Sequence, residues 1–134
     1  MVYTLSNLEK WIREELTVDV ESELSKYKEK MKAFVRLTPS GEVMLTQSNL
    51  TAKQKILLYL IGKVYSNIAK FSREASASNK ELGEVLGLPE GTIKTSLFAL
   101  RKEGLLIPQE TGVHQIKIER IGTAFSNYFG ESEK

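Results

Sequence analysis

Cysteine is absent from the 134-residue sequence, and histidine and tryptophan occur once each. Without cysteine the chain has no disulfide, no thiolate nucleophile and no Cys-based zinc or iron–sulfur site. The longest apolar run, residues 56–61, is far too short to cross a bilayer. The first eleven residues lack the basic and apolar regions of a secretory signal. We therefore expect a cytoplasmic protein with no membrane association, metal or cofactor.

Catalytic motifs are also missing. No glycine-rich phosphate loop follows a strand, and neither an HExxH nor a GxSxG motif is present. His114 has the same strand parity as Ile116 and Ile118, which indicates a partly buried or rim histidine rather than a general base. We expect that the protein is not an enzyme.

The composition is that of a folded domain with a mildly basic balance. Hydrophobic residues make up 41% of the chain and charged residues 27%, and the net charge is +2. Residues 1–50 carry 7 Lys/Arg and 8 Asp/Glu, whereas residues 51–134 carry 12 and 9. If the protein binds nucleic acid, we expect the second part of the chain to make the contact.

The N-terminal part of the chain contains two helical patterns and a hairpin pattern. Ser6 and Glu9 form a capping pair for a helix over residues 6–16. A second apolar stripe follows at steps of 4, 3, 4 and 3, in the residues Val20, Leu24, Tyr27, Met31 and Phe34. Two heptads favour packing on the protein's own domain over a dimer interface. Alternation around "TPSGE" predicts a β-hairpin over residues 34–46.

The second part begins with the most apolar helix. Thr51 is the expected cap of a helix over residues 51–71, whose apolar residues cover a broad surface. Residues 72–78 are small and polar, which predicts a loop. Ser78 and Glu81 form a second capping pair, for a helix over residues 79–87 with Leu82, Val85 and Leu86 facing inward. The polar residues 46–49 suggest a division into an N-terminal part, 1–46, and a domain, 47–134.

The stretch "GLPEGTIKTSLFALRKEGLL" predicts a turn between two helices. Gly87 suits a left-handed C′ position, and Pro89 suits the first position of a new helix. Ile93, Leu97 and Leu100 form an inward stripe. Gly104 ends this helix, which spans residues 89–103. We then expect a hairpin over residues 105–119 and a short helix over residues 120–130.

Residues 51–119 resemble a winged helix-turn-helix domain of small archaeal and bacterial transcription regulators. The segment "KELGEVLGLPEGTIKTSLFALRKEGLL" carries the resemblance. It implies an α+β fold, with a three-helix core, a β-hairpin wing and an N-terminal helical and hairpin extension. It also implies that helix 89–103 reads the major groove of double-stranded DNA and that the wing contacts the flanking backbone.

The predicted DNA-binding residues lie mostly on the outward side of helix 89–103, given a rotation of about 100° per residue. They are Lys80, Thr92, Lys94, Thr95, Ala99, Lys102 and Lys117. Short hydroxyls read base edges, and lysine donates to guanine or to phosphate. Arg101 and Lys102 offset the negative end of the helix dipole.

A different class of function stays open. Glu110 at the wing tip and Glu90 and Glu103 at the helix ends oppose phosphate binding, and winged helices also serve as docking modules within nucleic-acid-processing complexes. Phe98 either tucks toward the preceding helix, which we favour, or marks a protein-binding surface. The N-terminal part is a candidate element for homodimerisation or for docking a partner. RNA binding ranks third, because no stacking aromatics are interleaved with basic residues.

Overall fold

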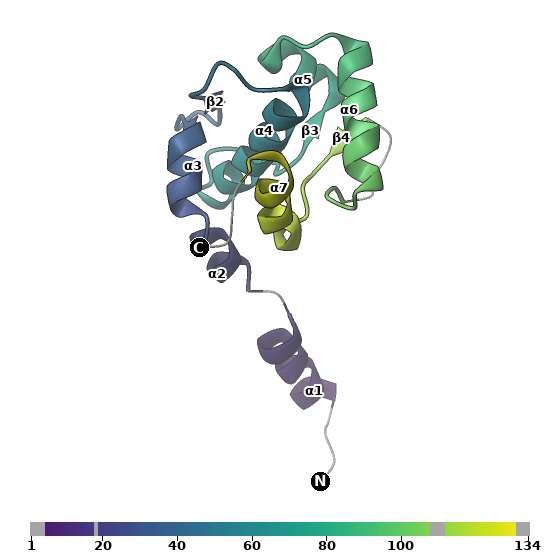
Figure 1. Cartoon of the computed structure of the whole chain (residues 1–134). Coiled ribbons are helices and arrows are strands. Elements are labelled where there is room, and N and C mark those ends of the chain that lie inside the picture. The colour runs from purple at the N-terminus through teal and green to yellow at the C-terminus, as the bar shows by residue number, and fades with distance from the viewer. Residues whose placement is uncertain (1–4, 18, 108–111, 131–134) are drawn as a thin grey trace.

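The protein is a mixed α+β structure with two small antiparallel sheets. The computed structural model describes residues 5–17, 19–107 and 112–130 (Figure 1). The elements follow in the order α1 (Leu5–Trp11), η1 (Ile12–Leu16), α2 (Val20–Ser25), α3 (Lys28–Phe34), β1 (Val35–Leu37), β2 (Val43–Leu45), α4 (Ala52–Ile68), β3 (Ala77–Ser78), α5 (Asn79–Leu86), α6 (Glu90–Lys102), β4 (Val113–His114), η2 (Ile118–Arg120) and α7 (Ile121–Tyr128).

Helix α4 lies at the centre of the molecule and contacts β1, β2, α5, α6 and α7. Its predicted cap is confirmed: the Thr51 hydroxyl accepts a hydrogen bond from the Gln54 N–H, and the Gln54 side chain accepts one from the Thr51 N–H. Residues 56–61 are buried on all sides. The helix ends earlier than predicted, at Ile68, because Lys70 has a left-handed backbone with φ 65°.

The predicted second helix is two helices, because the chain turns at Lys26 and Tyr27 between α2 and α3. Tyr27 has a non-helical backbone, with φ −111° and ψ 19°, and its ring stacks on Phe125 at a centroid distance of 5.6 Å. From Leu24 onward the apolar stripe nevertheless packs on the protein's own core, as favoured: Leu24 and Met31 are buried, whereas Val20 is exposed. The helix therefore breaks at the residue whose ring packs on Phe125.

The predicted N-terminal hairpin is confirmed. Strands β1 and β2 pair antiparallel, with Val35 opposite Leu45. Val43 packs on α4 at Gly62, where a Cβ atom would lie only 2.6 Å from the Val43 Cγ1 atom. The core is one cluster that includes Leu24, Val35 and Val43 together with the buried residues of the later elements.

Helices α5 and α6 meet through the predicted tight turn. The Ser78 hydroxyl accepts from the Glu81 N–H, and Gly87 is left-handed with φ 68° and ψ 30°. Pro89 is extended and precedes the first helical residue, so the predicted start of α6 is one residue early. The prediction that Val85 faces inward is wrong, because its side chain is exposed.

A small sheet lies beside α6. The predicted loop over residues 72–78 contains β3, in which Ala77 pairs with His114 and Ser78 with Val113. Just after β4, Ile116 forms an antiparallel bridge with Leu106. The Lys117 N–H donates to the Leu105 carbonyl at 2.9 Å and supports this bridge. We call residues 105–107, 112–117 and 77–78 the ribbon. Residues 108–111, including Glu110, lie outside the described residues.

The predicted C-terminal helix is α7, whose Ile121, Ala124 and Phe125 are buried against the core. Its Tyr128 hydroxyl donates to the Glu103 carboxylate at the end of α6. Burial, followed by this hydrogen bond, raises the pKa of Tyr128 to about 12. The hydrogen bond therefore links α7 to the end of α6.

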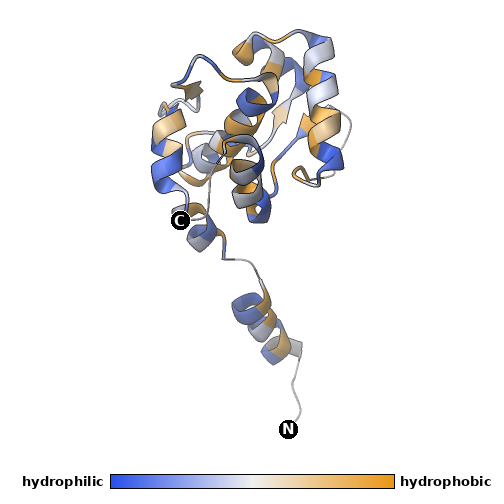
Figure 2. Ribbon diagram, in the orientation of Figure 1, coloured by the Kyte–Doolittle hydropathy of each residue, from blue (hydrophilic) through white to orange (hydrophobic). Residues whose placement is uncertain are grey.

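Helix α1 and the π-helical turn η1 extend from the body of the molecule (Figures 1 and 2). We call residues 5–16 the arm. The predicted start is slightly wrong, because Ser6 is the second residue of α1 rather than a residue before it. Within the described part of the chain, no helix combines the length and the apolar character that a membrane span requires.

Candidate functional site

The outward face of α6 is the candidate site. Ile93, Leu97 and Leu100 are buried as predicted, which turns the opposite side of the helix toward solvent. Lys94 and Thr95 are exposed, and Thr92 is partly buried near the helix start. An ammonium group and two hydroxyl groups therefore lie within the first two turns of one exposed helix.

The Lys94 ammonium lies 3.3 Å from the Glu90 carboxylate, one turn earlier. Both side chains are well exposed, at 62% and 80%. An exposed pair of this kind contributes little, about 0–1 kcal/mol, so Lys94 can exchange Glu90 for another anion at small cost.

Two depressions flank this face. Thr92 and Thr95 lie in an open depression of about 530 Å³ at the start of α6, lined also by Pro89, Gly91 and Ser96. A second one, of about 340 Å³, lies between α6 and the ribbon, and its lining is Asn79, Lys94, Leu97, Phe98, Arg101, Gly112 and His114. The face of α6 is thus continuous with the side of the ribbon.

Phe98 is 64% exposed, so the favoured prediction that it tucks toward the preceding helix is wrong. The Lys102 ammonium lies over its ring, 5.5 Å from the centroid. This cation–π contact leaves an aromatic ring on the surface beside Lys94.

The other predicted site residues are more dispersed. Lys80 is exposed at the start of α5, and Ala99 is partly buried on α6. Lys80 lines a different depression, together with Glu90. Lys117 lies in the ribbon and is partly buried. The structure therefore brings Thr92, Lys94 and Thr95 together, and leaves Lys80 and Lys117 at the margins.

Arg101 and His114 form a link between α6 and the ribbon that was not predicted from the sequence. The Arg101 guanidinium donates to His114 Nδ1 at 2.6 Å, and His114 Nε2–H donates to the Asn79 side-chain oxygen. His114 is buried, on the side that its strand parity indicates. Only the parity of His114 pointed toward this contact, because Arg101 and Asn79 are distant in sequence.

The neutral form of His114 is the one that fits this geometry. Burial, and then the positive charge of Arg101, lower the pKa of His114 to about 4. Protonation at Nδ1 would replace an acceptor with a donor that faces a guanidinium.

Acidification should therefore loosen the fold. Between pH 6.5 and pH 4 the unfolded chain binds a proton at His114 that the folded chain does not, so stability falls as the pH falls. From the shift to about 4, we expect this histidine to account for a loss of about 2–3 kcal/mol by pH 4. Urea unfolding of the wild type and of His114→Gln at pH 7 and pH 4 tests this. The free-energy gap between the two should narrow at pH 4, and a constant gap would contradict the assignment.

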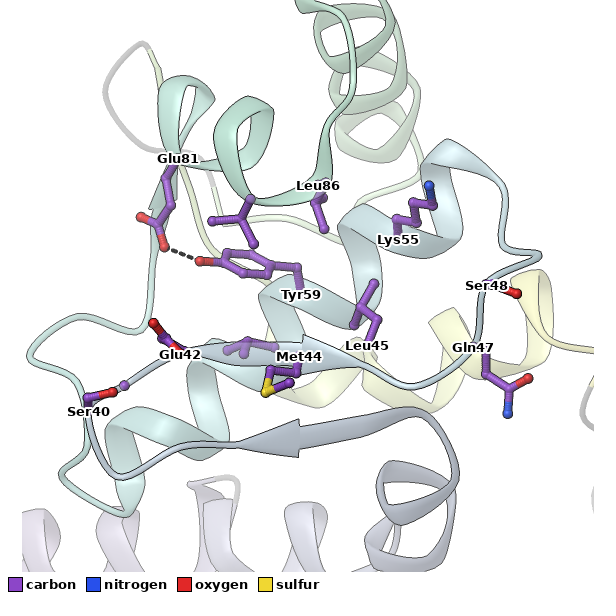
Figure 3. Close-up of a pocket in the computed structure, with 13 residues that line it drawn as sticks. Ser40, Glu42, Met44, Leu45, Gln47, Ser48, Lys55, Tyr59, Glu81 and Leu86 are labelled. Atoms are coloured by element: carbon purple, nitrogen blue, oxygen red, sulfur yellow. Dashed lines mark hydrogen bonds between the residues drawn. The ribbon is translucent and has the colours of Figure 1, made fainter.

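A partly buried polar cluster links α5 to α4. The Glu81 carboxylate accepts from the Tyr59 hydroxyl (Figure 3). The same carboxylate pairs with the Lys63 ammonium at 3.2 Å. Burial, followed by the contact with Glu81, raises the pKa of Tyr59. Tyr59 and Glu81 also line a groove of about 740 Å³ beside β2. Only the capping role of Glu81 was visible in the sequence.

No cluster of three or more His, Asp or Glu side chains suited to a metal ion occurs among the described residues. Comparisons of the chain with protein-family models, with curated proteins and with solved structures gave no match. The functional proposal therefore depends on the geometry of α6 and its surroundings.

Proposed function

We propose that the protein binds double-stranded DNA and regulates transcription, with residues 51–119 forming a winged helix-turn-helix domain. Three features support the domain: the tight turn at Gly87 between α5 and α6, the central α4, and the ribbon, most of which follows α6. In this arrangement α6 is the recognition helix and the ribbon is the wing.

The observation that carries the proposal is the composition of the exposed face of α6. Thr92, Lys94 and Thr95 are grouped on it, and the side chains opposite them are buried. The helix N-terminus itself favours anions. Lys94 would donate to a phosphate or to guanine, and the two threonines would contact base edges.

Selection from a random duplex library at several salt concentrations tests the proposal. One enriched motif is expected, with affinity falling steeply as salt rises. Absence of duplex binding even at low salt would refute it.

Changes on α6 should weaken binding without affecting the fold. Lys94→Ala is expected to reduce the affinity about tenfold. It should also reduce the number of counterions released on binding, given by the slope of log affinity against log salt, by about one. Thr95→Ala should cost about 1 kcal/mol or more of binding and relax the motif. Lys26→Ala is the matched control, because Lys26 follows α2, away from α6 (Figure 1). Fluorescence anisotropy gives the affinities, and unchanged affinity in both α6 variants would exclude this face.

The exposed ring of Phe98 favours a second candidate function, docking of a protein partner within a nucleic-acid-processing complex. Exposed aromatic residues are frequent anchors at protein interfaces. If the library selection yields no motif, this second function becomes the leading one.

A further inference from the structure

Within the described part of the chain, the arm presents an apolar face to solvent. Leu8, Trp11, Ile12 and Leu16 are between 40% and 63% exposed. In Figure 2 hydrophobic colour runs along one side of α1 and η1. The ion pair Arg13–Glu9 lies within the arm, and the Thr17 hydroxyl, just after it, donates to the Ile12 carbonyl. A helix of about twelve residues is marginal in isolation, so a docked surface would stabilise it.

The body carries an apolar groove whose rim holds three basic residues and one acidic residue, Glu29. We call it the α3 groove; its volume is about 640 Å³, and its lining is Lys28, Glu29, Met31, Lys32, Val35, Arg36, Leu37 and Tyr65. Met31, Val35, Leu37 and Tyr65 supply the apolar part. The volume lies within the range of about 300–1,000 Å³ that is typical of binding pockets.

The charges of the two surfaces are complementary. Glu14 and Glu15 of the arm are exposed and form no ion pair with a residue that the structure describes. Lys28 and Lys32, on the rim of the α3 groove, are also exposed and have no carboxylate partner within the described residues. Glu15 follows Trp11 by four residues, so the two lie on the same side of the arm.

We propose that the arm of one copy docks into the α3 groove of a second copy, in a reciprocal exchange. The same chain carries both complementary surfaces, so a two-fold arrangement satisfies both pairs at once and closes. A single short helix in one groove would bury a small area compared with the roughly 1,600 Å² of a standard interface. A reciprocal exchange forms two such contacts and so doubles the buried area. This inference goes beyond the proposed function and does not depend on DNA binding.

Trp11 is the only tryptophan of the chain, so its fluorescence reports the state of the arm directly. Sedimentation equilibrium and emission spectra of the full chain, without DNA, are measured from about 1 µM to about 500 µM, a range suited to micromolar affinity. We expect a monomer–dimer equilibrium, with the Trp11 emission moving to shorter wavelength as the dimer forms.

Variants separate this interface from other dimers. Leu8→Glu combined with Ile12→Glu should abolish the dimer and leave the far-ultraviolet circular dichroism of the body intact. Glu15→Lys alone and Lys32→Glu alone should each weaken dimerisation at least about tenfold, and the two together should restore it. Lys10→Glu is the matched control, because Lys10 lies about 200° around the helix from Leu8 and should not weaken the dimer.

Three results would overturn the inference. The first is a monomer at every concentration with constant Trp11 emission. The second is a dimer that survives Leu8→Glu with Ile12→Glu. The third is a short-wavelength Trp11 emission that does not change with concentration, which would mean that the arm docks on its own chain.

Discussion

Replacing Phe125 with Ala is expected to lower the free energy of unfolding by about 3–5 kcal/mol. Phe125 is 1% exposed. Its ring lies 5.6 Å from that of Tyr27 and 5.5 Å from that of Phe129, centroid to centroid. The substitution removes the ring that joins α7 to the junction of α2 and α3, and it leaves a cavity in the core.

Phe98→Ala is the matched control, since it removes the same side chain from a surface position. Phe98 is 64% exposed, so the stability should change by no more than about 0.5 kcal/mol. Urea unfolding followed by circular dichroism gives both values. If the two variants lost similar stability, the ring cluster would not be a principal part of the core.

Glu81→Ala is expected to cost about 2–3 kcal/mol of stability. The Lys63 side chain is 10% exposed, and its described carboxylate partner is that of Glu81. Without Glu81 a charge stays buried and unpaired, and the buried Tyr59 hydroxyl loses its acceptor. Because the Glu81 side chain is 32% exposed and water can enter, the cost stays below that of a fully buried pair.

Lys63→Met distinguishes the cost of an unpaired charge from the net value of the ion pair. Methionine occupies a similar volume without the charge, so the stability should remain within about 1 kcal/mol of the wild type. Glu84→Ala, an exposed glutamate on the same helix, should change it by less than about 0.5 kcal/mol. Denaturant unfolding of the three variants provides the comparison. A loss in Lys63→Met equal to that in Glu81→Ala would mean that the pair itself is strongly stabilising.

Local signals in the sequence predicted much of the backbone. The caps at Thr51 and Ser78, the left-handed Gly87 and the hairpin around "TPSGE" each depend on a few neighbouring residues, and all four occur in the structure. The buried stripe of α6 follows from helical periodicity alone. These features need no information from distant parts of the chain.

What the sequence could not predict depends on contacts between distant residues. Strand β3 has only two residues, too few for a periodic pattern, and its partner is β4, beyond α5 and α6. The break before α3 coincides with the packing of Tyr27 on Phe125. At the candidate site, the face of α6 followed from helix geometry, but the exposure of Phe98 and the anchoring of Arg101 by His114 did not.

The central position of α4 has a consequence for synthesis of the chain on the ribosome. The helix contacts the hairpin strands, which are made earlier, and α6 and α7, which are made later, and its residues 56–61 are buried. Until α7 has been synthesised, the most apolar helix keeps part of its surface open to water. Completion of the core therefore requires α7, and a nascent chain that stalls before α7 would expose a surface that chaperones recognise.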